Sequence, residues 1–526
     1  MKRGWLLPIA IALVAHGAAL GGGFAADDMP DIVAHPVVRG DAAPWQVYEY
    51  NYMGAPIGEG ANTVRPLATL LFAAEWAAWG ERPALFHAVS LLLFCGCVWV
   101  AYRYARLLAG DGVALATAAL FASLAIHVDA VGLVANSAEV LSLGLALAAL
   151  WAAARGRAGL AALAYAAALL SKESAIGVPA VAAAQLLFLT ARGSAERRAG
   201  ARALAAMLVA AAVYLAARAA LLDFDVEGSI IAADNPLLDA PAGTRLWMPL
   251  VLLGKYLATT MAPLSLAFDH TWNDVPAVVD LADPHGWLGL AAVIGFAAAA
   301  VAAWRRRAPR RSKVGICGDD QPDVAGPGAA LVALVGFAAA YALFSNSVFL
   351  IVTIYAERLF LAPSFWVCLA AAMGARWLAE REPSARRGLV GLAALVIASQ
   401  VALSALRSRE IGSNMDLLAS QVESAPDSLK GRLHYARELA ARGHAEEATW
   451  HIAVTYAGRR AFPDPSWRAP RDVEELPVEE RLARLPELVA PGTAPAEYWR
   501  RLRPVARRFV GPQALPVIDR YARGAR

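Results

Sequence analysis

The chain has 526 residues, of which 58% are hydrophobic and 17% are charged, and its formal net charge is +4. Soluble domains carry about 25% charged residues, so this composition excludes an ordinary soluble globular protein and indicates a polytopic membrane protein. The sequence also has no basic domain of the kind that binds nucleic acid, so we expect no nucleic-acid partner.

Eleven apolar segments are candidates for crossing the roughly 30 Å hydrocarbon layer of a membrane. They lie at about residues 5–23, 87–105, 112–127, 131–153, 158–171, 174–191, 203–221, 286–303, 329–350, 359–378 and 388–406. A further apolar stretch, 247–266, is interrupted by Lys255 and Pro263. Cys95, Cys97 and Cys368 lie within apolar segments, where we interpret them as small core residues.

Lysine and arginine residues predict the orientation, because cytoplasmic loops are enriched in them. The densest cluster runs from 305 to 313. All basic loops fall on one side only if 247–266 does not cross, so we predict a re-entrant or interfacial segment there. This topology has about eleven crossings, a cytoplasmic N-terminus and an external C-terminus. A cleaved signal peptide is an alternative for the first segment, and either way 27–86 lies outside.

The apolar segments also divide the chain into two parts. Residues 1–406 form the predicted membrane domain, with large external loops at 24–86 and 222–285. Residues 407–526 are charged and contain no apolar span, so we predict a small helical extracytoplasmic domain. Residue usage is typical of a bacterial genome, which predicts a bacterial inner membrane with this domain in the periplasm.

Acidic and basic side chains gather where the apolar segments end on the external side. In the first external loop these are Asp27, Asp28, Arg39 and Arg65. Arg65 begins the stretch TVRPLATLLFAAEWAAWG, whose apolar period and tryptophans predict a helix along the membrane surface. A plain interfacial anchor is the alternative for this stretch.

Three shorter motifs add polar groups at similar depth, where such groups are costly and tend to be functional. The turn AIHVDAV holds His127 and Asp129, LLSKESAIGVP holds Lys172 and Glu173, and TIYAERLFLAPS holds Glu357 and Arg358. The alternatives are a solvated turn for the first and a local Lys172–Glu173 pair for the second. Arg358 needs an anionic partner, either Glu357 or a ligand. No nucleotide-binding or zinc-protease motif stands in a convincing context, which favours a lipid-borne substrate.

Seven stretches in collinear order resemble the membrane O-mannosyltransferases that carry C-terminal tetratricopeptide repeats, the TMTC-like branch of the C-class glycosyltransferases (GT-C), and their bacterial relatives. The resemblance covers about residues 1–450. The stretches are DDMPDIVAHPVVRG, VRPLATLLFAAEWAAWG, FHAVSLLLF, LFASLAIHVDAV, LLSKESAIGVPAV, the long stretch from DNPLLDAP to HTWNDVP, and AERLFLAPS. The long stretch contains Asp269, which we add to the candidate site residues.

The resemblance implies an all-α fold of about eleven membrane helices with its active site on the extracytoplasmic face. It also implies a polyprenyl-phosphate sugar as donor, and an acid of the first external loop as catalytic base, which falls on Asp27 or Asp28. Arg65, Lys172 and Arg358 are then candidates for holding the donor phosphate. The need for a divalent metal stays open, and we predict no metal ligands.

His127 and Asp129 match the second histidine and the acid of the family's His-Pro-x-His-x-Glu turn, in which Leu124 and Ala125 replace the first histidine and the proline. Residues 428–457 resemble one tetratricopeptide-like helix pair, and an acceptor protein is a possible partner of this part.

Two other functions compete with a glycosyltransferase. A transporter or flippase for lipid-linked sugars predicts inverted repeats and charges near the bilayer midplane. A noncatalytic membrane scaffold predicts that Asp27 and Asp28 can both be replaced without loss of function.

Overall fold

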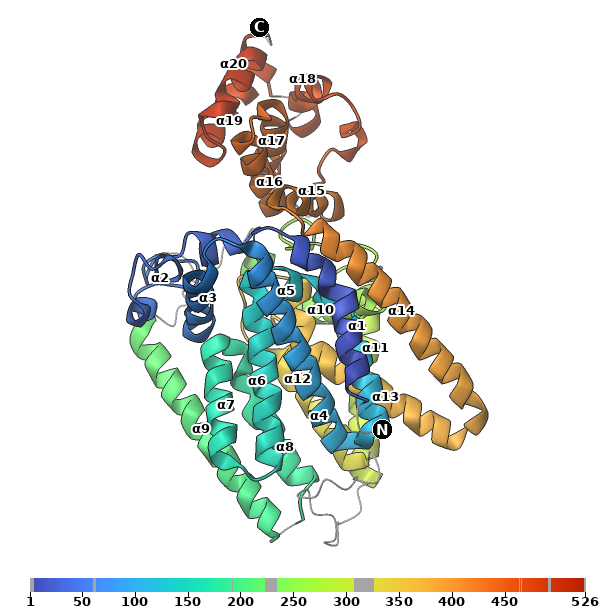
Figure 1. Ribbon diagram of the computed structural model, residues 1–526. Helices are drawn as coiled ribbons and strands as arrows, with labels where there is room; N and C mark the ends of the chain where they lie inside the picture. Colours follow the sequence, from blue (N-terminus) through green and yellow to red (C-terminus); the bar gives the residue numbers. More distant parts are fainter. Residues whose placement is uncertain are drawn as a thin grey trace.

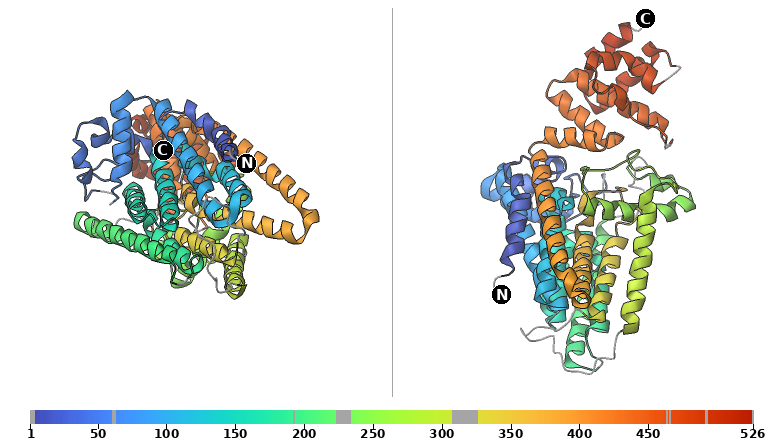
Figure 2. Two further views of the ribbon diagram at one scale, coloured as in Figure 1. Left: turned by 60° about the horizontal axis from the view of Figure 1, so that its bottom comes forward. Right: turned by 90° about the vertical axis from the view of Figure 1, so that its right-hand side faces the viewer.

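The computed structural model describes residues 4–59, 63–191, 193–222, 234–306, 326–462, 464, 466–490 and 493–524. Within these residues the regular secondary structure is helical, apart from two isolated β-bridges, as the all-α prediction requires. Of the basic cluster at 305–313, residues 307–313 lie outside this part of the chain. Figure 1 and the right-hand view of Figure 2 show a helical bundle with a smaller group of helices, the tail, standing on one end of it.

The bundle contains both long helices and shorter ones. Its helices are α1 (Leu6–His16), α2 (Pro36–Arg39), α3 (Pro66–Trp79), α4 (Pro83–Ser123), α5 (Val128–Gly132), α6 (Ser137–Ala154), α7 (Ala158–Ser171), α8 (Val178–Phe188), α9 (Ala195–Leu221), α10 (Ala242–Met261), α11 (Pro284–Arg306), α12 (Pro327–Ala342), α13 (Leu361–Arg381) and α14 (Arg386–Glu410). We call residues 22–65, between α1 and α3, the first loop, and the bundle end beneath the tail the tail-side end.

Each of the eleven predicted apolar segments coincides with helical structure. Six helices of the described part are long and apolar enough to cross a membrane, and four shorter apolar helices accompany them. The long α4 holds two of the segments, because Gly110 has φ +81° and divides it into arms at 83–109 and 111–123. The segment at 329–350 is helical only to Ala342. The number of crossings itself stays a prediction.

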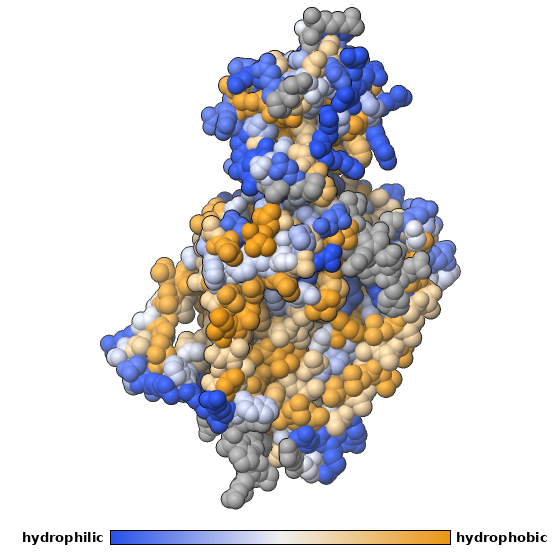
Figure 3. All heavy atoms as spheres, turned by 180° about the vertical axis from the view of Figure 1, so that it is seen from behind, coloured by the Kyte–Doolittle hydropathy of each residue, from blue (hydrophilic) through white to orange (hydrophobic). Residues whose placement is uncertain are grey.

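The outward faces of several helices are apolar and have no protein partner. Val390 and Leu395 on α14 are 64% and 67% exposed, and Val209 and Val213 on α9 are 63% and 65% exposed. Figure 3 shows hydrophobic residues along the side of the bundle and mostly hydrophilic residues on the tail. Such a surface is stable against lipid rather than water, so the chain is a membrane protein.

Helices α10 and α11 approach each other closely through glycines. A Cβ added at Gly289 would lie 1.9 Å from the Leu250 carbonyl oxygen, and one at Gly254 would lie 1.9 Å from the His285 carbonyl oxygen. Small residues allow membrane helices to pack at such short distances. α10 is not among the helices that are long and apolar enough to span, and its predicted re-entrant or interfacial position stays a prediction, as does the surface position of α3.

The tail consists of α15 (Asn414–Ser424), α16 (Leu429–Ala441), α17 (Ala445–Ala461), α18 (Val478–Val489), α19 (Pro495–Phe509) and α20 (Leu515–Gly524). Trp450, Leu482 and Trp499 belong to an apolar core that these helices share. α16 and α17 pack as a helix pair, with Ala436 and Ala448 fully buried. This pair covers the stretch that resembles a tetratricopeptide unit.

We predict that Gly289→Ala lowers the apparent melting temperature of the purified protein. The added methyl group meets backbone atoms of α10, so the helices must separate, at a cost of about 1–3 kcal/mol. Gly295→Ala is the matched control, because it lies on the same helix and its Cβ would have no neighbour within 4 Å. Thermal denaturation in detergent compares the two variants, and equal melting temperatures would contradict the close packing.

Candidate active site

A group of charged side chains gathers at the tail-side end of the bundle. They come from the first loop, from the short helices η6 (Glu173–Gly177) and η9 (Glu357–Phe360), from the segment 262–283 between α10 and α11, and from α16 of the tail. Charges in such surroundings are costly unless they are paired. The contacts of each side chain therefore show whether its charge is already compensated within the protein or is available to a ligand.

The two adjacent aspartates of the first loop have different surroundings. Asp28 is fully buried, and its oxygens accept hydrogen bonds from the backbone amides of Ala135 at 2.7 Å and Ala25 at 3.2 Å. Burial raises the pKa of Asp28 to about 7, and the amides oppose this rise. Asp27 is partly exposed, and its carboxylate accepts no hydrogen bond from the residues that the structure describes. Asp28 therefore anchors the loop, while Asp27 is available to a ligand.

A third acid of the first loop, Asp31, lies one helical turn after Asp27. Its backbone N–H donates to the Asp27 carbonyl at 3.0 Å, its side chain is buried, and its Oδ1 has no hydrogen-bond partner. Burial and the charge of Asp27 raise the pKa of Asp31, while Arg65 and Arg358 lower it. Asp31 was not among the site residues predicted from the sequence, although the spacing within DDMPD indicates it.

Arg65 is bound by a carboxylate from a distant part of the chain. Its Nε and Nη2 donate to the two oxygens of Glu173 at 3.3 and 3.0 Å, and its guanidinium lies 4.6 Å from the ring centroid of Tyr52. The following Pro66 starts α3 and restricts the backbone of Arg65 to a non-helical conformation. The Arg65–Glu173 pair is bidentate, the strongest geometry for these groups.

Lys172 also has a carboxylate partner, but not the one expected as the local alternative. It pairs with Glu139 of α6, and both side chains are buried. The alternative of a local Lys172–Glu173 pair is therefore wrong. The two neighbours leave the end of α7 toward different partners, because Lys172 is extended and Glu173 begins η6.

Arg358 is the cation whose charge is least satisfied by direct contacts. Its Nη1 donates to the Phe268 carbonyl at 2.8 Å and its guanidinium lies 5.2 Å from the Phe268 ring centroid. It forms no ion pair with a carboxylate among the described residues, although Asp269, Asp27 and Asp129 act on it electrostatically. Glu357, the partner expected as one alternative, bonds to His270 instead.

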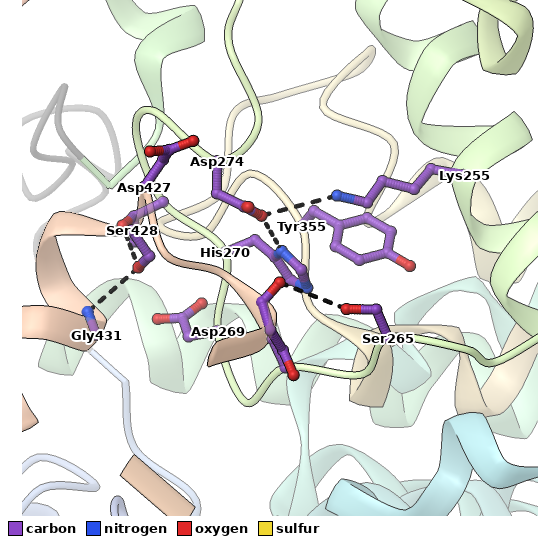
Figure 4. A network of polar contacts seen from close by, with 12 residues as sticks. Lys255, Ser265, Asp269, His270, Asp274, Tyr355, Asp427, Ser428 and Gly431 are labelled. Carbon is purple, nitrogen blue, oxygen red and sulfur yellow. Dashed lines mark hydrogen bonds and ion pairs between the residues drawn. The ribbon is translucent and has the colours of Figure 1, made fainter. Parts of the chain in front are cut away.

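His270 joins two acids on the 262–283 segment and η9 (Figure 4). Its Nδ1 bonds to Asp274, its Nε2 lies 3.0 Å from Glu357, and Asp274 lies 3.8 Å from Lys255. The sequence analysis did not select His270 or Asp274. Both stand in the stretch FDHTWND, where only the neighbouring Asp269 was chosen.

Asp269 is held by a cation from the tail. Its Oδ2 accepts from Lys430 of α16 at 2.7 Å and its Oδ1 from the Thr353 hydroxyl at 2.9 Å. Lys430 and the charge of Arg358 lower the pKa of Asp269, although burial opposes them. No sequence motif pointed to Lys430.

The remaining candidates lie in three different surroundings. Asp129 is buried near Arg358, Glu357 and His270, 3.9 Å from Arg407, so it belongs to the charged group. His127 packs against Phe94 and Phe121 and bonds to the Ser364 hydroxyl at 2.8 Å. Arg39 is exposed and pairs with Asp41 at 3.4 Å. The structure therefore brings Asp129 into the group and leaves His127 and Arg39 outside it.

An apolar hollow of about 720 Å³ opens between α3, α7 and α9, beside the Arg65–Glu173 pair. Pro66, Leu170, Val213 and Leu221 are among its lining residues. Tyr214, also in the lining, interacts electrostatically with Glu173 and Arg65. The hollow thus runs from an apolar helix surface to the charged group. Among the described residues no three histidine, cysteine, aspartate or glutamate side chains are arranged to hold a metal ion.

Comparisons with known proteins find several relatives with similar names. The chain is 31% identical over 293 residues to protein O-mannosyl-transferase Tmtc2 of Drosophila melanogaster, which is 52% of this chain and 31% of that protein. It is 33% identical over 133 residues to protein O-mannosyl-transferase TMTC1 of Homo sapiens, or 24% of this chain and 15% of that protein. The matches thus cover less than a third of these relatives' own length. No protein-family model matches the chain.

A third relative, protein O-mannosyl-transferase F38B6.6 of Caenorhabditis elegans, is 26% identical over 154 residues, or 28% of this chain and 22% of that protein. The resemblance stated from the sequence motifs and these independent similarities agree. Over about half of its length, the chain is therefore similar to the TMTC-family protein O-mannosyl-transferases.

Proposed function

We propose that this protein transfers a mannose-like hexose from a polyprenyl-phosphate donor to a hydroxyl group of a protein or glycan acceptor. The names of its relatives support transfer of a sugar. The observation that carries the proposal is that the charged group at the end of an apolar bundle contains both a carboxylate without hydrogen bonds, Asp27, and a cation without a carboxylate ion pair, Arg358, among the described residues.

Asp27 is the general base in this proposal. The acceptor hydroxyl gives its proton to the Asp27 carboxylate while its oxygen forms a bond to the anomeric carbon of the sugar. The bond from that carbon to the phosphate oxygen breaks, and the phosphate leaves with the electron pair. A carboxylate without other hydrogen bonds can reach the acceptor, which Asp28 cannot do while it binds two backbone amides.

Arg358 stabilises the leaving phosphate. Positive charge is needed where negative charge develops on the departing oxygens, and an arginine can present two donors to a phosphate. Arg65 and Lys172 stay candidates for the same task, but each already binds a glutamate. Arg65 and Lys172 contact the donor phosphate only if the phosphate displaces these carboxylates. Otherwise their positive charges act on the phosphate from a distance.

The hollow between α3, α7 and α9 is suited to the isoprenoid chain of the donor. Its lining is mostly alkyl groups and it ends beside Arg65, which begins α3. α9 exposes apolar side chains outward, so a lipid chain enters from the bilayer without crossing a polar surface.

The topology belongs to the proposal as well. We place the N-terminus in the cytoplasm and the tail-side end, with the tail, in the periplasm of a bacterial inner membrane. The positive-inside distribution of the sequence supports this orientation, and the proposed reaction then takes place at the external membrane surface.

We predict that Asp27→Asn lowers the rate of sugar transfer by at least about 100-fold, the usual contribution of a general base, and leaves the melting temperature unchanged. Transfer from a synthetic polyprenyl-phosphate mannose to a serine-containing peptide measures this rate. Asp28→Asn should instead destabilise the fold by about 1–3 kcal/mol, because an amide cannot accept both backbone hydrogen bonds.

Asp41→Asn is the control for both aspartate variants, because Asp41 is an exposed carboxylate of the same loop. It should transfer sugar at the rate of the unaltered protein. Full transfer by Asp27→Asn would overturn the role of Asp27 as general base. No transfer by the unaltered protein would instead favour the noncatalytic scaffold.

We predict that Arg358→Met lowers kcat by about 100- to 1,000-fold, as expected for the loss of one donor that stabilises the leaving group. Arg358→Lys should recover part of the rate, since it restores the charge but not the planar pair of donors. Arg39→Met, which removes an exposed arginine outside the charged group, should leave kcat unchanged. Equal kcat values for the Arg358 and Arg39 methionine variants would contradict this role.

Reporter fusions after residues 280 and 524 should both give the external signal in a bacterial host. A fusion after residue 193, in a basic loop, should give the cytoplasmic signal and serves as the control. A cytoplasmic signal after residue 280 would show that 247–266 crosses the membrane, contrary to the proposed topology.

A further inference from the structure

The first two helices of the tail bind the loop that carries Asp27. The Gly23 amide donates to the Gly412 carbonyl at 3.1 Å, and the Ala26 amide donates to Oδ1 of Asn414 at 2.9 Å. The other end of the Asn414 side chain donates to Glu438 of α16 at 2.7 Å, which fixes the orientation of its amide. The residue directly before Asp27 is therefore attached to the tail.

The same helices bind the 262–283 segment through its backbone. Gln421 accepts from the Asp269 amide at 3.1 Å and donates to the Asp269 carbonyl at 2.6 Å. The Asn273 amide donates to the Asp427 carbonyl at 3.0 Å, and Thr271 and Ser428 share a hydroxyl–hydroxyl bond of 2.9 Å. Figure 4 shows Asp427 and Ser428 beside Asp269 and His270. The first loop and the 262–283 segment, two of the segments that build the charged group, are thus both in contact with the tail.

α16 also presents side chains to the charged group itself. Lys430 and His434 are four residues apart and so lie on one face of the helix, and Asp27 and Asp269 act on both electrostatically. Lys430 is 36% exposed although it binds Asp269, and His434 is exposed. Both side chains are therefore accessible to solvent.

The Lys430–Asp269 pair has a consequence for Arg358. Asp269 exerts the largest single charge effect on Arg358. With Lys430 bound at one oxygen and Thr353 at the other, this carboxylate is engaged. If Lys430 were removed, Arg358 would be the neighbouring cation left to compensate Asp269.

We propose that α15 and α16 complete the active site, with Asn414 and Lys430 as positioning residues. Asn414 holds Asp27 in place, and Lys430 engages Asp269 so that Arg358 stays available for the donor phosphate. This inference rests on the proposed function. It assigns the tail a part in the transfer step, in addition to any part in recruiting an acceptor.

The first test concerns Lys430. Lys430→Met should raise the KM for the polyprenyl-phosphate donor and lower kcat, together by about 10- to 100-fold, because Arg358 is displaced toward Asp269. Lys430→Arg should restore most of the activity. The double variant Lys430→Met with Asp269→Asn should be more active than Lys430→Met alone, since the competing carboxylate is gone. Arg437→Met is the control, because it removes one exposed positive charge from the same helix, and the hydrogen bond of Arg437 within the described residues goes to Phe509 of the tail.

The second test does not depend on sugar transfer. Asn414→Ala should speed amide hydrogen exchange in residues 22–34 of the purified protein, while the control Arg437→Met should leave that exchange unchanged. If the unaltered protein transferred no sugar but Asn414→Ala still loosened this loop, the proposed function would fail and the attachment would stand. Unchanged exchange in Asn414→Ala, or unchanged donor KM and kcat in Lys430→Met, would overturn the inference.

Discussion

The hydrogen bond that Asp28 accepts from the Ala135 amide holds the first loop against the turn before α6, and the charged group is arranged around that attachment. Because the Asp28 side chain is drawn into the bundle by the amides of Ala25 and Ala135, Asp27 is turned the other way. The next helical turn then carries Asp31 to the same side as Asp27. One buried carboxylate thereby determines where its two neighbours lie.

Because Asp28 is buried, its protonation state also affects the stability of the fold. Its folded pKa of about 7 lies above the ordinary value of 3.8, so the native chain keeps a proton that the unfolded chain releases between these values. The resulting contribution to stability is present at acid pH and is lost as the pH rises through about 7. Near neutral pH, burial of the Asp28 side chain therefore costs less free energy than burial of a permanently charged carboxylate would.

Most of the other charged side chains of the group form ion pairs with one another. Glu173 binds Arg65, Glu139 binds Lys172, Asp269 binds Lys430, and His270 lies between Glu357 and Asp274. Burial makes each of these charges unfavourable unless its partner is close, so the pairs are fixed parts of the structure. Among the described residues, Asp27 remains as a partly exposed acid whose carboxylate accepts no hydrogen bond, and Arg358 as a cation without a carboxylate ion pair, whereas the unbonded acids Asp31 and Asp129 are buried. A reaction that moves a proton from an acceptor and releases a phosphate needs one group of each kind.

The sequence predicted the helices well because each apolar segment carries its own local signal. It also identified most of the charged positions, since Asp27, Arg65, Asp269 and Arg358 stand at the ends of such segments. The sequence did not predict which of these charged side chains pair with one another. Lys172 and Glu173 are neighbours in sequence but face different partners, and His127 lies close to Asp129 in sequence yet packs against aromatic rings and Ser364. The direction of a side chain depends on contacts made by distant segments, which a local pattern does not contain.

Lys430 is the clearest case of this limit, because 161 residues separate it from Asp269. Its position also constrains how an acceptor can arrive. The bundle closes the charged group from below, and the tail contacts the first loop at 412–414 and the 262–283 segment at 421–429. Asp27, Lys430 and His434 are at least partly exposed to solvent. If Asp27 is the general base, as we propose, an acceptor hydroxyl reaches it from the side on which these three side chains are accessible.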